Sequence, residues 1–522
     1  MKKNIINIYM VVAAISSSLL LNGCTDKFEE INTNPYTITS EELQADFQHV
    51  GAPFSQAQQN LYSFTPAWVT QLQQNLIGDV FSGYMMPPTP FASNSNNMTY
   101  NLVDGWNGFP WNTAYQNVMG PLAKADLAAG EGDEFNNFKA WSKIIRVEAM
   151  HRISDIYGPI VYRNFGQENA VYESQQAVYN AFFEDLESAV DILTPLISEE
   201  ARPFTKFDLV YGGDYTKWVQ FANSLRLRLA IRISDVDPTL AKTKGEAALA
   251  HSVGLIESND ANFLVSNTSG ITHPLNVINQ SWNDIRMGAE MESILTGYDD
   301  PRMGAYFETA GDYEGQYKGI RQGIPIEAKS DYQGFSPLTE FDPTIQLLSA
   351  AEVHLLKAEA ALKGWTGAGD AQTNYETGIA TSFNQHGAVG SAAYMADNSS
   401  VPVDYVDPFN ASNSINALST ITIAWDAAAS TEENLERIIT QKWIAMYPDG
   451  QEAWSEFRRT GYPKLFPVVV NNSGGKISTE EHIKRINFPS SEVDGNPTGV
   501  AEGVKHLGGE DHGGTSLWWD VD

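Results

Sequence analysis

The residues best suited to chemistry in this sequence are aromatic rings in a short polar segment. Residues 104–112 read Asp-Gly-Trp-Asn-Gly-Phe-Pro-Trp-Asn, which places Trp106, Phe109 and Trp111 among two glycines and a proline. This composition predicts a loop, because glycine and proline disfavour a helix and proline is rare in a central strand. Such rings can stack on the C–H faces of a neutral sugar while Asn107 hydrogen-bonds a hydroxyl group. The alternative is that the rings anchor the loop to the core.

A second group of rings follows later in the chain. Trp282 precedes a helix-like stretch, where it could contact a ligand or pack at the start of the helix. Tyr313 and Tyr317 lie within residues 311–319, another glycine-rich composition in which exposure is expected. The predicted ligand-binding residues are Trp106, Asn107, Phe109, Trp111, Trp282, Tyr313 and Tyr317.

Motifs for catalysis or metal binding are not found in the sequence. The 9 histidines form no His-Glu-x-x-His motif, and the 1 cysteine has no second cysteine to join it. No Gly-x-Ser-x-Gly elbow, Walker loop or dinucleotide glycine fingerprint occurs. A carboxylate pair for glycoside hydrolysis stays open, since any of the 64 Asp and Glu residues could meet in space. The sequence therefore predicts no cofactor, no metal ion and no identifiable catalytic residue.

The charge balance narrows the class of ligand. The 522 residues include 33 Lys and Arg against 64 Asp and Glu, which gives a net charge of −31. Binding to a phosphate backbone is driven by Lys and Arg, and no run of basic residues follows Lys2 and Lys3. Nucleic acid, anionic membrane surfaces and polyanionic glycans are therefore disfavoured. A neutral ligand fits best.

The N-terminus resembles a bacterial lipoprotein signal. A basic start precedes an apolar run from Ile5 to Leu21, which is broken by serines and too short to span a bilayer. Leu-Asn-Gly-Cys at the end of this run is similar to the lipoprotein processing box, which implies cleavage before Cys24 and lipidation of its sulfur. A spare or buried thiol is the alternative. We expect a signal peptide at 1–23, a lipidated tether at 24–40 and a single ligand-binding domain at 41–522.

Helical periodicity provides the elements that must position the rings. Apolar residues at three- and four-residue steps predict helices over 135–157 and 178–193, and a further helix begins after Asp214, an N-cap candidate. Residues 347–363 and 368–383, joined by a glycine-bounded turn, predict a helical hairpin whose spacing resembles a tetratricopeptide unit.

Long polar segments interrupt these helices. They lie at about 84–111, 254–283, 309–343, 387–422 and 467–522. Segments of this length in a compact protein are usually functional or disordered. Residues 467–470 read as a short strand, and Trp518 and Trp519 read as packing anchors for the C-terminus.

A set of sequence blocks in this order resembles the SusD family of outer-membrane glycan-binding lipoproteins, particularly its SusD-like and RagB-like branches. The blocks are Cys24 with residues 28–35, residues 214–228, Asp300-Pro301-Arg302, and residues 351–360, 441–447, 452–463, 485–489 and 518–520. The acidic residues after Cys24 are similar to the signal that sends lipoproteins of Bacteroidetes-type bacteria to the outer face of the outer membrane. A solvated tether is the alternative interpretation.

The resemblance implies a mostly α fold, in which a tetratricopeptide-like scaffold of helical hairpins carries long irregular loops and a few short strands. It also implies a cell-surface lipoprotein that binds a glycan without covalent chemistry and sits as a lid on a SusC-like TonB-dependent transporter. Arg302, Arg458 and Arg459 are then structural residues. Two other functions stay open, namely a glycoside hydrolase on a helical toroid and a peptide-import lid of the RagB type.

Overall fold

Helical hairpins form the scaffold of the protein. The computed structural model describes residues 45–168, 170–199, 204–267 and 270–521, so the predicted signal peptide, Cys24 and the tether lie outside the described residues. The chain divides into two units, Met1–His49 and Val50–Asp522, and the second contains every helix from α5 onward. Among the described residues, every helix is too short or too polar to span a bilayer.

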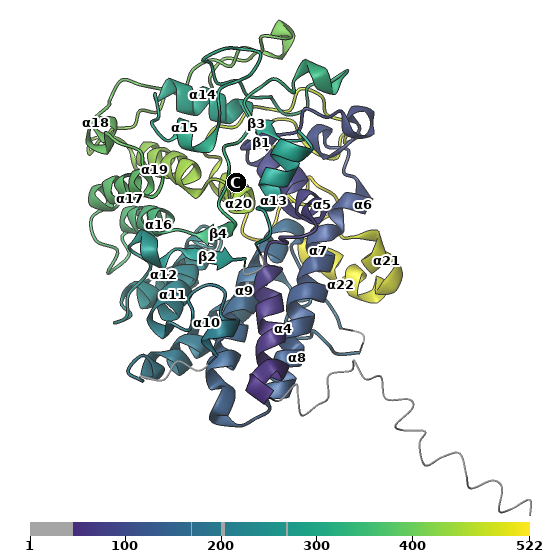
Figure 1. Cartoon of the computed structure of the whole chain (residues 1–522), viewed down its shortest axis with the longest axis vertical. Helices are drawn as coiled ribbons and strands as arrows, with labels where there is room; N and C mark the ends of the chain where they lie inside the picture. The colour runs from purple at the N-terminus through teal and green to yellow at the C-terminus, as the bar shows by residue number, and fades with distance from the viewer. Residues whose placement is uncertain (1–44, 169, 200–203, 268–269, 522) are drawn as a thin grey trace, which may run out of the picture. The chain divides into compact units, whose positions relative to one another are not determined.

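The hairpins are paired in chain order (Figure 1). The pairs are α9 (Asn136–Tyr157) with α10 (Gln175–Leu196), α11 (Tyr215–Arg232) with α12 (Pro238–Leu249), α16 (Ala350–Leu362) with α17 (Ala371–Gln385), and α19 (Thr431–Met446) with α20 (Gly450–Thr460). Successive pairs are joined because α10 packs on α11, α11 on α16, and α16 on α19. These contacts confirm the predicted mostly α, tetratricopeptide-like fold, in which each pair buries its faces against its neighbours.

Local sequence signals set the ends of these helices. α9 stops at Gly158, whose φ of 92° is a conformation that glycine adopts without strain. Asp214 caps α11, since its side chain accepts a hydrogen bond from the backbone N–H of Lys217 at 3.2 Å. The predicted hairpin is confirmed as α16 and α17. Its helices approach closely because Gly378 has no Cβ, which would lie 2.7 Å from Leu355.

Ion pairs lie buried between the hairpins. Arg228 on α11 donates two hydrogen bonds to Glu352 on α16, at 2.8 and 2.7 Å. Arg459 on α20 binds both oxygens of Glu359 on α16, at 2.7 and 2.8 Å. Burial alone would raise the pKa of Glu456, but Arg459, Lys442 and Arg232 outweigh it and hold that pKa well below its usual range. These charges connect helices that are distant in sequence.

The arginines of the sequence blocks are part of this buried framework. Arg302 is 0% exposed and bonds both oxygens of Asp300, at 2.9 and 2.6 Å. The guanidinium group of Arg458 lies 3.7 Å from the centre of the Trp454 ring. A structural role for these residues agrees with their burial.

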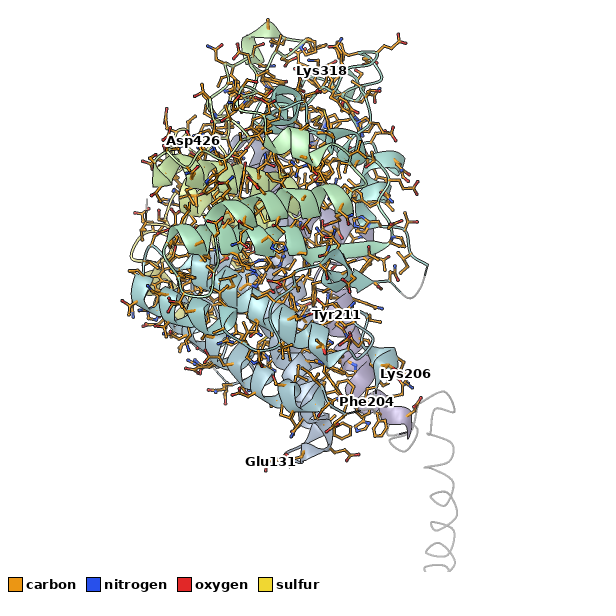
Figure 2. The ribbon with its side chains drawn as sticks, turned by 90° about the vertical axis from the view of Figure 1, so that its left-hand side faces the viewer. Glu131, Phe204, Lys206, Tyr211, Lys318 and Asp426 are labelled. Carbon is orange, nitrogen blue, oxygen red and sulfur yellow. The ribbon has the colours of Figure 1, made fainter. Side chains whose placement is uncertain are left out.

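The loop region, residues 84–108 and 270–343, lies above the scaffold in Figure 1. β1 (Met85–Met86) pairs antiparallel with β3 (Arg286–Met287), with Met85 opposite Met287. β2 (Phe263–Ser266) pairs antiparallel with β4 (Thr344–Leu348), with Phe263 opposite Leu348. Because β4 takes up residues 347 and 348, the hairpin helix begins later than predicted. Figure 2 shows Lys318 of the loop region far from Glu131 and Phe204 of the scaffold.

Shorter helices complete the chain. They are η1 (Ala45–Phe47), α4 (Gln48–Gln59), α5 (Ala67–Thr70), η2 (Gln71–Asp79), η3 (Phe91–Asn94), η4 (Asn97–Thr99), α6 (Asp104–Asn107), α7 (Phe109–Thr113), η5 (Ala114–Met119), α8 (Gly120–Ala129), η6 (Asp133–Phe135), η7 (Thr205–Phe207), η8 (Asn259–Ala261), α13 (Pro274–Asn276), η9 (Val277–Ser281), α14 (Ala289–Gly297), α15 (Met303–Tyr306), η10 (Lys329–Asp331), α18 (Ser391–Met395), η11 (Ala411–Asn413), α21 (Ser490–Gly495) and α22 (Pro497–Leu507).

The C-terminal segment corrects two predictions and confirms one. Residues 467–470 form no strand, and the expected irregular tail contains α21 and α22. α22 begins in an Asn-Pro pair, in which Asn496 caps the helix by accepting from Gly499 N–H at 3.0 Å. Trp519 is 0% exposed and donates to Asp155 at 2.8 Å, which confirms it as a packing anchor.

Candidate functional site

Two pairs of aromatic rings form a surface beside η2. Trp68 on α5 and Phe109 on α7 meet edge to face, with centroids 5.3 Å apart, and Phe91 and Trp106 meet in the same way at 5.7 Å. α5, α6 and α7 all pack against η2, which brings the pairs to one part of the molecule. Trp68 is 47% exposed, an unusual value for so large an apolar side chain. We call Trp68, Phe91, Trp106 and Phe109 the aromatic ledge.

The ledge rests on two single-turn helices, where the sequence predicted a loop. The prediction of a loop was wrong because Pro110 and Gly105 occupy positions at which proline and glycine are compatible with a helix. Pro110 is in the first turn of α7, where its missing N–H has no partner to lose, and Gly105 of α6 has open space beside it. Asp104 fixes α6 by accepting from the backbone N–H and the hydroxyl of Ser490, at 3.2 and 2.6 Å.

Asn107 does not face a ligand, in contrast to the prediction. Its side chain is 1% exposed, and its Oδ1 accepts a hydrogen bond from Asn97 at 2.8 Å. Its backbone carbonyl accepts from the hydroxyl of Tyr157 on α9. Asn107 therefore fastens α6 to the scaffold.

Trp111 is also a core residue and corrects the prediction. Its ring is 3% exposed, stacks on Tyr172 at 5.4 Å and meets Tyr157 edge to face at 5.2 Å. A ring packed in this way has no free face for a sugar. Trp106 and Phe109 are half-buried, so for them the ligand-binding role stays a prediction.

Trp282 lies at the end of η9, which packs against α5 beside the ledge. Its carbonyl accepts from Lys329 Nζ at 2.6 Å, and Lys329 also pairs with Asp284 at 2.6 Å. Arg286 donates to the carbonyl of Gln333 at 2.8 Å, and burial lowers its pKa to about 10. The ring of Trp282 is half-buried, and its segment is held by these bonds.

Tyr313 and Tyr317 contact different elements. Tyr313 meets Phe335 edge to face at 5.5 Å, and burial, followed by the charge of Asp312, raises its pKa. A Cβ on Gly304 would lie 3.4 Å from the hydroxyl of Tyr317, which places Tyr317 over α15. The structure thus brings Phe109 and the segment of Trp282 to α5, and it places Trp106 on α6 against η2. Tyr317 lies over α15, and Tyr313 lies against Phe335.

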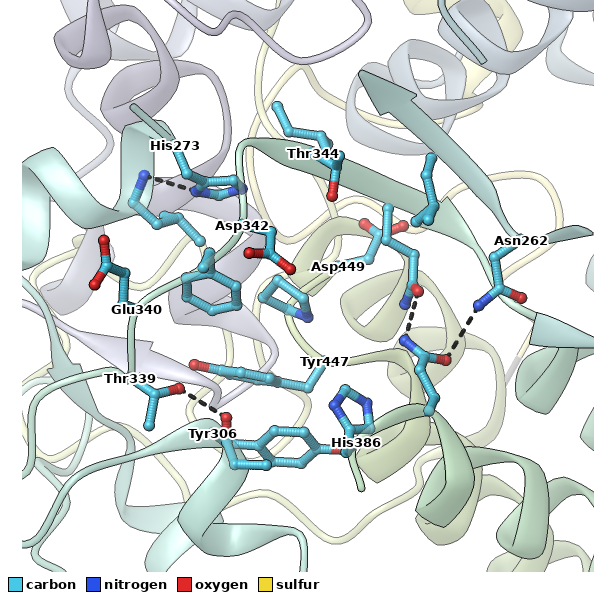
Figure 3. A pocket seen from close by; sticks show the side chains of 18 of the residues that line it. Asn262, His273, Tyr306, Thr339, Glu340, Asp342, Thr344, His386, Tyr447 and Asp449 are labelled. Atoms are coloured by element: carbon cyan, nitrogen blue, oxygen red, sulfur yellow. Dashed lines mark hydrogen bonds between the residues drawn. The ribbon is translucent and has the colours of Figure 1, made fainter. Parts of the chain in front are cut away.

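A cavity of about 540 Å³ lies beside α13. α13 packs against α5, and its Leu275 lines the cavity together with Tyr62 and Gln74, which flank α5. Figure 3 shows Tyr306, Tyr447 and His386 close together in it, with Asn262 on the side opposite Glu340. The volume is in the range of pockets that hold small ligands.

The walls of this central cavity carry rings, uncharged polar groups and three acids, Glu340, Asp342 and Asp449. Tyr306 meets His386 at 4.8 Å and Tyr447 at 4.6 Å, and His273 stacks on Phe341 at 5.0 Å. Burial lowers the pKa of His273 to about 3, and burial followed by the charge of Arg302 lowers that of His386 to about 4. Both imidazoles are neutral at pH 7.

Two residues that line the cavity contribute polar atoms that the protein itself buries. Among the described residues, the Tyr447 hydroxyl and His386 Nε2 are buried without a hydrogen-bond partner. Gln385 links two walls by donating to Gln346 at 2.7 Å and accepting from Asn262 at 3.3 Å. No lysine or arginine is among the described residues that line the cavity. The arrangement suits hydroxyl and amide groups and disfavours anions.

Sequence reasoning missed the cavity and the most exposed ring of the ledge. Trp68 follows Pro66 at the start of a new helix, but it stands at four-residue steps from Leu72, Leu76 and Val80, so the local pattern does not distinguish it from a core residue. Tyr306 and Tyr447 lie 141 positions apart in the sequence, and no local pattern links them.

Among the described residues, no group of three or more His, Cys, Asp and Glu side chains could hold a metal ion. Of the three acids that line the cavity, Glu340 and Asp342 are exposed, and Asp449 is buried and paired with Arg152 at 2.6 Å. The site therefore offers contact surfaces and hydrogen-bonding groups to a ligand.

The comparisons with known proteins agree with this fold. The family model for SusD-like, SusD and RagB outer membrane lipoproteins matches residues 30–520. A chitin-binding SusD homolog from Flavobacterium johnsoniae is 48% identical with a TM-score of 0.89, covering 91% of this chain and 99% of that one. SusD homologs from Bacteroides vulgatus and Bacteroides uniformis are 38% and 36% identical, with TM-scores of 0.86 and 0.85 and the same coverages of 91% and 99%.

A search of curated proteins found no match. The family match spans nearly the whole described chain, and the solved relatives cover the scaffold, the ledge and the cavity alike. The chain therefore belongs to the SusD-like family of outer-membrane lipoproteins.

Proposed function

We propose that this protein captures a neutral oligosaccharide or polysaccharide at the cell surface, without cleaving it, and delivers it to a SusC-like TonB-dependent transporter. The observation that carries the proposal is the ledge, where Trp68 is 47% exposed and edge to face with Phe109. An exposed ring held by a second ring is a platform for the apolar face of a sugar. The neighbouring cavity supplies hydrogen-bonding groups for its hydroxyls.

Two observations support a neutral glycan. The lining of the central cavity holds neutral imidazoles and amides, its acids are exposed or, for Asp449, paired with Arg152, and the chain carries a net charge of −31. Uronate-rich or sulfated polymers would be repelled by this field. The Flavobacterium johnsoniae relative is described as chitin-binding, and chitin is an uncharged polymer. Chitin oligosaccharides are therefore the first ligands to try.

The transporter partner rests on family membership and on the predicted lipid anchor at Cys24. A protein fixed to the outer membrane by lipid can remain close to a barrel embedded in the same membrane. Co-purification of the lipidated protein with a TonB-dependent transporter from detergent-solubilised outer membranes would support this part of the proposal. Recovery of the protein alone would contradict it.

Calorimetric titration of the purified protein tests glycan binding directly. The panel contains chitin oligosaccharides, an α-glucan, a β-glucan and a polyuronate. We expect binding of a neutral member, and we expect Trp68→Ala to weaken it about tenfold, close to 1.4 kcal/mol, because the exposed ring contributes mainly to the ligand contact. Trp425→Ala is the matched control. Trp425 packs on Tyr375 of the scaffold, with ring centroids 5.4 Å apart, so its loss should leave the glycan affinity unchanged.

The alternatives predict different outcomes of the same titration. Cleavage of the oligosaccharide into shorter products, detected by chromatography, would indicate a glycoside hydrolase. Binding of peptides with no response to any glycan would indicate a peptide-import lid. Equal affinity of Trp68→Ala and the unmodified protein would remove the ledge from the site.

A further inference from the structure

A second cavity lies along the same helix that carries the ledge. It has a volume of about 490 Å³ and lies between η5, the turn around residue 166 and α21. Its lining includes Asn112 and Gln116 of the helix, Tyr115 and Phe165 as rings, and Glu492 of α21. We call it the α21 cavity. Figure 1 shows α21 beside α6 and α7.

The helix connects the ledge to this cavity without a break. α7 runs directly into η5, and residues 109, 112 and 116 lie on its accessible side, whereas Trp111 and Thr113 are buried. Positions three and seven residues apart share one face of a helix. Residues 109–113 are α-helical and 114–119 form a π-helix, so the path from Phe109 to Gln116 is no longer than about 10 Å, the value for an α-helix at roughly 1.5 Å per residue. A ring of the ledge thus begins a row that ends in the cavity.

The rings of the cavity are fixed in place. Tyr115 and Phe165 are stacked with centroids 5.8 Å apart and an interplanar angle of 28°. The Tyr115 hydroxyl donates to the carbonyl of Val161 at 2.8 Å and accepts from its N–H at 3.0 Å. Trp111 lies against Tyr115 at 4.8 Å. Val161 and Trp111 both hold Tyr115 in place. The half-buried Phe165 is therefore the outer ring of the stack.

The polar groups of the cavity suit an uncharged ligand. Amides of Asn112, Gln116 and Gln167 line it, and no lysine or arginine is among the described residues that do. Its acid, Glu492, accepts a hydrogen bond from the hydroxyl of Tyr172 at 2.7 Å. Amides both donate and accept, which matches sugar hydroxyls in either role.

We propose that the α21 cavity is a second subsite, which takes further uncharged sugar residues of the same glycan chain whose first residues lie on the ledge. The inference rests on the proposed function and deepens it, because it makes the binding affinity depend on the length of the glycan chain. Contacts at two places on one chain act together, so a chain long enough to reach both binds more tightly than a short one.

The test compares oligosaccharides of one neutral glycan from the disaccharide to the hexasaccharide, by calorimetry. We expect the affinity of the unmodified protein to rise with length. Phe165→Ala should weaken the hexasaccharide about fivefold to tenfold and leave the disaccharide unchanged. Gln116→Trp fills the cavity from an exposed position and should also weaken the hexasaccharide without affecting the disaccharide. This second variant keeps the test valid if loss of the Phe165 ring disturbs the turn. Trp68→Ala should weaken both lengths.

Each contrary result has a distinct meaning. If the unmodified protein binds the glycan with an affinity independent of length, or if both cavity variants leave the hexasaccharide unchanged, the second subsite is overturned and the proposed function stands. If both variants weaken the two lengths equally, the cavity is structural and the subsite is again overturned. If no glycan binds at all, the proposed function and the subsite fail together.

Discussion

Two buried carboxyl groups, Glu456 in the scaffold and Glu290 in the loop region, have pKa values shifted in opposite directions. In the scaffold, Glu456 lies among Arg459, Lys442 and Arg232, and its pKa is held well below the usual range. In the loop region, Glu290 is equally buried but accepts from the backbone N–H of Phe466 at 3.2 Å, and burial raises its pKa to about 7. Glu456 is therefore held by charge pairs between the hairpins, whereas Glu290 is held by a backbone hydrogen bond.

Aromatic residues show the same contrast. Trp443 of α19 is 1% exposed and donates to the carbonyl of Ser82 at 2.9 Å, so its ring and its N–H are both used within the protein. Trp106 in the loop region is half-buried beside Phe91. The difference suggests that the scaffold determines stability and the loop region determines ligand contact, and the two can be separated by substitution.

The largest effect is expected at a scaffold ion pair. Arg228→Ala leaves Glu352 buried without its two hydrogen bonds and should lower the free energy of unfolding by about 3–5 kcal/mol. Chemical denaturation measures this loss. Arg163→Ala is the control, because its partner Glu184 is exposed and such pairs contribute less than about 1 kcal/mol. Equal losses for the two variants would show that the buried pair does not fasten the hairpins.

Two tryptophans five positions apart sharpen the contrast further. Trp111→Ala should cost about 3–5 kcal/mol of stability, since the ring is packed on Tyr172 and Tyr157. Trp106→Ala should change the melting temperature little and weaken glycan binding about tenfold. Thermal unfolding and calorimetric titration of both variants provide the check. A large loss of stability for Trp106→Ala with unchanged affinity would make its ring a core residue.

The buried carboxyl of Glu290 gives a prediction for pH. Below its ordinary pKa of 4.5 the group is protonated in both the folded and the unfolded chain, and its contribution is fully present. As the pH rises towards about 7 the unfolded chain ionises first, so this contribution to stability is lost. Relative to Glu290→Gln, the unmodified protein should lose roughly 2–3 kcal/mol between pH 4.5 and a pH above 7. Parallel pH profiles from denaturant titrations would contradict the raised pKa.

The smallest expected effects come from two aspartates at helix N-termini. Asp214→Ala removes the cap of α11 and should cost about 1 kcal/mol of stability, with glycan affinity unchanged. Asp104→Ala releases α6 from Ser490 and should weaken glycan binding severalfold with little change in stability. Denaturation and titration of both variants separate these roles. The same response from both would mean that the ledge is not positioned by α6.

The sequence was sufficient for the scaffold because its signals are local. The stripe in 135–157, the cap at Asp214 and the glycine-bounded turn between α16 and α17 each depend on neighbouring residues. It was insufficient for the site, because exposure depends on residues distant in sequence. Trp111 is buried by Tyr172 and Phe488, and nothing near Trp111 indicates this.

The short helices were missed for a related reason. α6, α7 and α21 have only a few residues each, too few for a periodic pattern, and they are held by contacts such as that of Asp104 with Ser490. The central cavity is likewise assembled from segments between Tyr62 and Asp449. The predicted roles of Trp282, Tyr313 and Tyr317 remain predictions for the titrations above.

The anchoring of α6 at both ends has a thermodynamic consequence. Asp104 is bonded to Ser490 and the carbonyl of Asn107 to Tyr157, so the backbone beneath Trp106 is ordered before any ligand arrives. Little conformational entropy of the protein remains to be lost on binding, and most of the ordering falls on the sugar chain. A stiff ledge also cannot reshape itself to a different ring geometry. Selection among glycans would then arise from the shape of the ligand, with the protein acting as a fixed template.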